Sequence, residues 1–174
     1  MTYLLTFACY GTYIPGARKD VVSRKRNQIG DPYVMLNPGL ASNCTGAMRE
    51  PPYILDKPCG EAVLEAMISV CKFRGWHAHC IHARTTHVHA VVTANQEPER
   101  MLIDFKAYAS RSLNETRLDA PNRIRWARHG STQYLWDEPS IAAAIRYVAC
   151  DQGEPMALYL YSRAPVAVSS RALR

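Results

Sequence analysis

Hydrophobic and polar positions divide the chain into short segments typical of strands and longer segments with helical spacing. Apolar residues recur every three to four positions in three segments: 60–74, 98–118 and 138–150. Segments rich in β-branched and aromatic residues predict four strands: 3–10, 76–84, 87–93 and 156–161. A loop is expected over 128–136, after the break at Pro121.

This element order predicts an α+β fold. It favours an antiparallel sheet of about four to five strands with packed helices, ferredoxin-like in outline. With 174 residues the chain is most simply a single domain, 1–174. Residues 11–60 hold many Gly, Pro and Asn residues and predict a long irregular insertion, and a frayed tail is expected after about residue 162.

A His-x-His pair begins the predicted strand 87–93. His87 and His89 point to the same side of the strand, roughly 6–7 Å apart along the backbone. Two imidazoles so placed can bind one divalent ion, while the apolar residues that alternate with them bury the opposite face. A second pair, His77 and His79, lies on the preceding strand. His87 and His89 are the better candidates, because their strand has an apolar opposite face and leads into the next helix.

Tyr108 lies in that next helix, at the edge of its buried stripe. Its neighbours one and two turns away are polar, where a core tyrosine would have apolar ones: Asp104, Arg111, Ser112 and Glu115. A phenol with a pKa of about 10 is a poor nucleophile unless it or its target is activated. A metal ion held by His87 and His89 can polarise a phosphate. Lys106 and Arg111 lie close enough in sequence to neutralise phosphate oxygens.

The charge of the chain suits a polyanionic partner. The net charge is +6 and the isoelectric point is about 9.1. Arg123, Arg125 and Arg128 flank Trp126 and His129. Basic residues interleaved with aromatic ones can hold a phosphate backbone with unstacked bases beside it. These residues are therefore candidates for DNA binding.

On these motifs the chain resembles the single-tyrosine HUH transposases of the IS200-like superfamily, in particular the REP-associated tyrosine transposases of bacteria. The matching segments are 4–7, 86–92, 105–111 and 128–132. The resemblance implies that His87 and His89 bind Mg or Mn. It also implies that Tyr108 attacks single-stranded DNA beside a hairpin, which leaves a 5′-phosphotyrosine and a free 3′-OH for rejoining.

The resemblance is incomplete at one position. Relatives of this kind often supply a third metal ligand, commonly an amide, one turn after the tyrosine, and this chain has Ser112 there. A serine hydroxyl is a weak neutral ligand. The third ligand is then Ser112, Glu115 or water.

Three alternatives compete with this interpretation. The first is a domesticated or inactive relative that binds hairpin DNA without cleavage. The second is a nucleotide hydrolase of the histidine-triad kind, and it fails because this chain has Val91 where that kind carries its third histidine. The third is a metal-binding or purely structural domain in which Tyr108 belongs to the core.

The sequence also predicts where the protein acts. The N-terminus lacks the basic region and cleavage signature of a secretory signal, and no apolar run approaches the roughly 20 residues of a membrane helix. The six cysteines include no C-x-x-C pair. We therefore expect a cytoplasmic protein with no membrane partner, and the sequence leaves a homodimer open.

Overall fold

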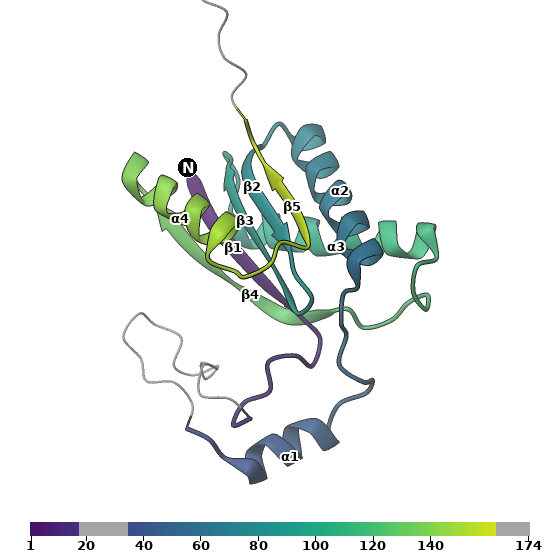
Figure 1. Ribbon diagram of the computed structural model, residues 1–174. Helices are drawn as coiled ribbons and strands as arrows, with labels where there is room; N and C mark the ends of the chain where they lie inside the picture. Colours follow the sequence, from purple (N-terminus) through teal and green to yellow (C-terminus); the bar gives the residue numbers. More distant parts are fainter. Residues whose placement is uncertain (18–34, 163–174) are drawn as a thin grey trace, which may run out of the picture.

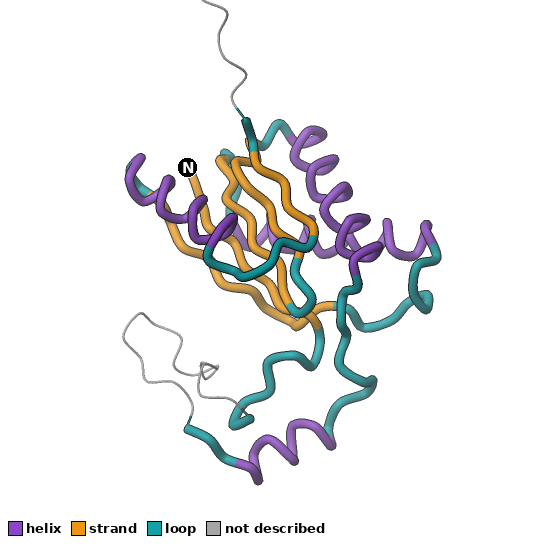
Figure 2. The backbone as a smooth tube through the Cα atoms, viewed as in Figure 1, coloured by secondary structure: helices purple, strands orange, loops and turns teal. Residues whose placement is uncertain are grey.

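A five-stranded antiparallel sheet forms the centre of the computed structural model, which describes residues 1–17 and 35–162 (Figures 1 and 2). Its strand order is β4-β1-β3-β2-β5. The strands are β1 (Thr2–Cys9), β2 (His77–Ala83), β3 (His87–Thr93), β4 (Trp126–Leu135) and β5 (Ala157–Leu160). The helices are α1 (Pro38–Gly46), α2 (Lys57–Arg74), α3 (Pro98–Thr116) and α4 (Glu138–Cys150). The first four strands, with α2 and α3 as crossovers, have the ferredoxin-like order, which confirms the predicted α+β fold.

Different helices cover the two faces of the sheet. The apolar side chains of β1 and β3, Phe7 and Val88 among them, pack with α2 and α3 in the larger core. Val91, Ala144 and Val148 belong to a smaller core under α4. Figure 1 shows α4 in front of the sheet and α3 behind it. Both crossover helices lie on one face because β–α–β connections are right-handed, and α4 is left to cover the other.

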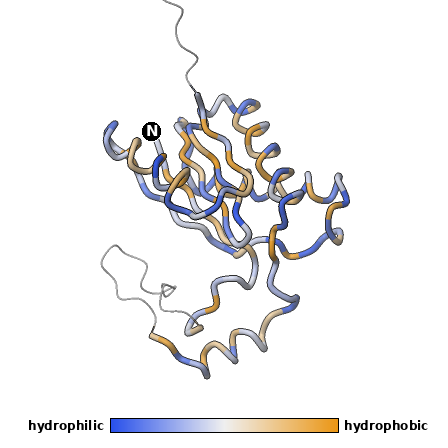
Figure 3. Tube along the Cα trace, in the orientation of Figure 1, coloured by the Kyte–Doolittle hydropathy of each residue, from blue (hydrophilic) through white to orange (hydrophobic). Residues whose placement is uncertain are grey.

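Helix α2 has clear sequence signals at both ends. Asp56 is its N-cap, and its carboxylate accepts a hydrogen bond of 2.9 Å from the Cys59 N–H. Gly75 ends the helix in the left-handed conformation, with φ of 69°. Hydrophobic and hydrophilic residues alternate around its turns (Figure 3). Its buried residues include Val63 and Met67, which pack against the sheet.

Strand β4 replaces most of the loop expected over 128–136. It is an edge strand that pairs only with β1, and most of its side chains are at least partly exposed. An edge strand of this kind lacks the apolar alternation by which a strand is recognised. Gly130 permits its close approach to β1, because a Cβ there would lie 2.6 Å from the carbonyl oxygen of Thr6.

Helix α1 lies within the segment 11–60 that was expected to be irregular. The Asn37 side chain caps it by accepting a hydrogen bond of 2.9 Å from the Leu40 N–H. No residue of α1 is buried, so the helix has no apolar stripe by which its sequence could reveal it. Residues 18–34, and the tail after residue 162, lie outside the described part of the chain. Among the helices described, none has both the length and the apolar character to cross a membrane.

Candidate functional site

His87 and His89 lie on β3 and project from the face of the sheet that α4 covers. Val91, two positions further along the strand, belongs to the core under α4, whereas Val88 belongs to the core under α2 and α3. The two imidazole rings share the α4 face because strand side chains alternate. Their centroids are 4.6 Å apart at an interplanar angle of 75°. The two imidazoles are therefore close enough together to bind one ion.

Hydroxyl groups hold both imidazoles by the same ring nitrogen. Thr6 Oγ1 on the neighbouring strand β1 lies 2.7 Å from His89 Nδ1. Tyr13 Oη lies 3.2 Å and Thr86 Oγ1 3.0 Å from His87 Nδ1. These contacts leave Nε2 of each ring as the nitrogen that can bind a metal. Hydrogen bonds to the distal nitrogen orient a ligating imidazole, so the contacts are those expected around a metal site.

Burial keeps both imidazoles neutral at pH 7. Burial, together with a smaller effect of the neighbouring His87, lowers the pKa of His89 to about 4, against the opposing effect of a hydrogen bond to Gln152. Burial also lowers the pKa of His87. A histidine binds a metal in its neutral form, so the pair is ready to do so without losing protons.

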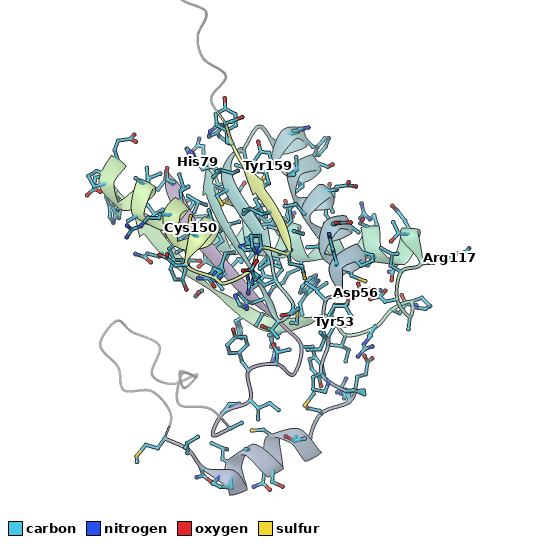
Figure 4. All side chains as sticks on the ribbon, in the orientation of Figure 1. Tyr53, Asp56, His79, Arg117, Cys150 and Tyr159 are labelled. Atoms are coloured by element: carbon cyan, nitrogen blue, oxygen red, sulfur yellow. The ribbon has the colours of Figure 1, made fainter. Side chains whose placement is uncertain are left out.

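Tyr147 on α4, like Tyr13, lies beside this pair. Its ring centroid is 5.5 Å from that of His89 at an interplanar angle of 69°, and 42% of the residue is exposed. A capping box between Asp137 and Ser140 starts α4. Burial of Val148, the next residue, fixes the rotation of the helix so that Tyr147 sits at the edge of its sheet-facing side. In Figure 4 the labelled Cys150 marks this last turn of α4, in front of the sheet.

An amide and a guanidinium complete the surroundings of the histidines. Gln152, just after α4, makes a side-chain hydrogen bond that raises the pKa of both imidazoles. Arg84, on the turn before β3, lowers the same two pKa values through its positive charge. Its Nη1 donates a hydrogen bond of 2.7 Å to the carbonyl oxygen of Glu154. Two imidazoles, a phenol, an amide and a cation therefore meet in one place.

This donor set fits a divalent ion. In the described part of the chain, no three His, Cys, Asp or Glu side chains converge to hold a metal. Among the described residues, a third protein ligand beside His87 and His89 would have to be of another kind, and the Gln152 amide oxygen could serve. Two neutral imidazoles and an amide oxygen, completed by water, suit Mn and related divalent ions.

Tyr108 lies on the opposite face of the sheet from the histidines. It is on α3, where it packs against the core under α2 and α3, and the Arg111 guanidinium lies 5.1 Å from its ring centroid. Ser112 and Glu115 are on the same helix, and Ser112 Oγ donates a hydrogen bond of 3.4 Å to the Ala62 carbonyl on α2. The structure therefore does not bring Tyr108 or these two candidate ligands together with the histidine pair.

Three of the five basic residues expected to bind DNA make contacts within the protein. Arg125 is 2% exposed, and its guanidinium pairs with Asp119 at 2.6 Å. Lys106 Nζ donates hydrogen bonds of 2.9 and 3.0 Å to two carbonyl groups of β4, and burial lowers its pKa. Arg123 lies 3.8 Å from Glu50 and donates hydrogen bonds to the carbonyl groups of Pro51 and Pro52.

The other two, Arg111 and Arg128, are exposed. Arg111 lies on α3, on the far side of the sheet from the histidines, and Arg128 lies on the edge strand β4. Sequence reasoning missed Tyr147, Gln152 and Arg84. Only the topology could have indicated them. The apolar side of β3 must face the two crossover helices, so its histidines face the helix that covers the opposite side of the sheet.

No protein-family model and no curated protein matches the chain. Among solved structures, it is similar to a REP-associated tyrosine transposase bound to a REP hairpin, with 9% identity and a TM-score of 0.46. That match covers 84% of this chain and 63% of the other, so this chain spans less than two thirds of that protein. A candidate transposase from Deinococcus radiodurans has 12% identity and a TM-score of 0.42 over 85% of this chain and 88% of the other. At these identities the likeness concerns the fold alone.

Proposed function

We propose that this chain is a metal-dependent transposase that cleaves and rejoins single-stranded DNA beside a hairpin, with Tyr147 as the nucleophile. The observation that carries the proposal is the contact between the Tyr147 and His89 rings, 5.5 Å apart, over a pair of neutral imidazoles. A partly exposed phenol next to a candidate metal pair suits attack on a phosphodiester.

The reaction needs no external source of energy. The Tyr147 phenol loses its proton, and its oxygen forms a bond to the phosphorus while the bond from phosphorus to the 3′-oxygen breaks. The departing 3′-oxygen takes up a proton, and the 5′-phosphate stays on the tyrosine. Rejoining reverses these steps, because the phosphotyrosine ester conserves the bond energy of the phosphodiester.

The surrounding side chains have distinct tasks in this scheme. His87, His89 and Gln152 would hold Mg or Mn, which when bound polarises a phosphate oxygen and offsets its charge. Thr6 and Tyr13 orient the two imidazoles through their Nδ1 atoms. The Arg84 guanidinium supplies a positive charge beside the histidines, where the phosphate would lie.

Tyr108 is the competing nucleophile, since the sequence motifs favoured it. Its position on the face of the sheet opposite the histidines makes it the weaker candidate. The same assay tests both residues, because substitution of phenylalanine removes only the phenolic oxygen from either one.

The deciding experiment is denaturing gel electrophoresis of the protein with end-labelled single-stranded hairpin DNA and Mn. We expect a covalent protein–DNA band for the wild type and for Tyr108→Phe, and none for Tyr147→Phe. Loss of the band only in Tyr108→Phe would reassign the nucleophile. Hairpin binding by the wild type with no band under any metal condition would instead indicate an inactive relative that binds without cleavage.

A further inference from the structure

His82 is a buried histidine that the proposed reaction does not use. It lies on β2, has no exposed surface, and pairs across the sheet with His89 in the backbone register. Its Nδ1 lies 2.8 Å from the carbonyl oxygen of Val148, the residue that follows Tyr147. Its Nε2 accepts a hydrogen bond of 3.4 Å from the Met156 N–H, just before β5. Both ring nitrogens therefore contact backbone groups on other elements.

These contacts fix the tautomer of the ring. The Met156 N–H can only donate, so Nε2 must be the unprotonated nitrogen. Nδ1 then carries the proton and donates to the Val148 carbonyl. This carbonyl is one of the last four of α4, which have no partner within the helix. His82 thus provides, from the sheet, the hydrogen bond that the last turn of α4 lacks.

We propose that His82 is a positioning residue that sets the place of Tyr147 relative to His89. The inference rests on the proposed function, because it concerns the geometry of the nucleophile. The hydrogen bond between His82 and Val148 holds the backbone next to Tyr147 against β2. The strand register places His82 opposite His89 on the adjacent strand. A nucleophile displaced by about 1 Å can lower the reaction rate about 100-fold. Because Val148 is the residue next to Tyr147, the hydrogen bond from His82 to Val148 matters more for the rate than the hydrogen bond from Met156 to His82.

Two substitutions separate the effects of the two His82 hydrogen bonds. An asparagine amide reaches about where Nδ1 lies, so His82→Asn keeps the donor to the Val148 carbonyl and loses the acceptor for Met156. A glutamine amide reaches about where Nε2 lies, so His82→Gln does the reverse. Both variants place an amide in the same buried position, which makes each the control for the other.

The first test measures single-turnover cleavage of hairpin DNA at saturating Mn and DNA. We expect His82→Asn to stay within about 3-fold of wild type and His82→Gln to lose about 10- to 100-fold, with the affinities for Mn and DNA little changed in both. The matched controls His79→Asn and His79→Gln, on the same strand, should leave the rate unchanged. Equal losses in the two His82 variants, or rates that simply follow their melting temperatures, would overturn the proposal.

The second test needs no cleavage. Fluorotyrosine incorporated throughout the protein gives a ¹⁹F resonance for Tyr147, which Tyr147→Phe assigns by its disappearance. We expect the chemical shift of this resonance to move towards that of a solvent-exposed fluorotyrosine in His82→Gln and to stay unchanged in His82→Asn. An unmoved resonance in both variants would contradict the positioning role. Because this readout does not depend on activity, it distinguishes failure of the inference from failure of Tyr147 as the nucleophile.

Discussion

The ring of Tyr147 contacts the ring of His89, 5.5 Å between centroids, although the two residues lie on different elements far apart in the chain. The contact exists because α4 covers the face of the sheet from which His89 projects. It brings a phenol with a partly exposed side chain to a pair of neutral imidazoles.

Replacing Tyr147 by phenylalanine should abolish covalent attachment to DNA, because it removes the attacking oxygen and keeps the ring. We expect cleavage to fall by about 1,000-fold or more, whereas Tyr108→Phe should stay close to wild type. Quantitative single-turnover assays on a labelled hairpin substrate measure both rates. Unchanged DNA binding by Tyr147→Phe in a gel-shift assay is the control that the fold is intact.

Removal of the third ligand should weaken metal binding. Gln152→Ala should raise the dissociation constant for Mn by about 10- to 100-fold, because the remaining sites must be completed by water. Asp151→Ala, at the neighbouring exposed position, is the matched control and should leave it unchanged. Isothermal titration calorimetry with Mn provides the measurement. If the two variants bind Mn equally well, Gln152 is not a ligand.

Loss of either histidine of the pair should abolish metal-dependent cleavage. In His87→Ala or His89→Ala, the remaining imidazole cannot hold the ion against water, and excess chelator should have the same effect on the wild type. The assay is cleavage of hairpin DNA over a range of Mn concentrations. Cleavage that continues undiminished in excess chelator would refute the metal site.

The buried pair of Arg125 and Asp119 should contribute to stability rather than to DNA binding. Burial alone would raise the pKa of Asp119, but hydrogen bonds from Arg125 and Tyr53 hold it below its ordinary value. The stabilisation of the folded state by ionised Asp119 is therefore present above the ordinary aspartate pKa of about 4. It is lost as the pH falls through the lower pKa that Asp119 has in the folded protein. Asp119→Asn should lower the free energy of unfolding at pH 7 by about 3 kcal/mol, because it leaves the Arg125 charge buried and unpaired.

Urea denaturation at pH 7 and at pH 3 checks this prediction. The wild type should lose stability between the two values, and Asp119→Asn should lose less, since its amide does not titrate. If the variant is as stable as the wild type but binds DNA more weakly, the result would indicate that Arg125 binds DNA.

DNA binding should favour a single strand beside a hairpin over a matched duplex and should weaken with salt. The phosphate must swing into line with the phenol, which a stacked duplex resists, and contacts from basic side chains release counterions. Arg84→Gln should reduce the slope of log affinity against log salt by about 1, whereas Lys72→Gln, on the far side of the sheet, should not. Fluorescence anisotropy with labelled hairpin and duplex at several salt concentrations measures both effects.

The alternation of side chains along the strand 87–93 determined that His87 and His89 share one face and that Val88 and its apolar neighbours bury the other. The helices α2, α3 and α4 also followed from the spacing of their apolar residues, because each has a stripe that packs against the sheet. Such patterns are local, and local backbone geometry fixes them.

Only the tertiary structure decided which helical tyrosine meets the histidines. Tyr108 and Tyr147 both lie at the edge of the buried stripe of a helix, and nearness in sequence favoured Tyr108. The choice depends on which helix covers which face, and this follows from β4, whose exposed edge position hides it in the sequence. Once β4 pairs with β1, α3 becomes a crossover on the same face as α2, and α4 alone remains for the face that carries the histidines.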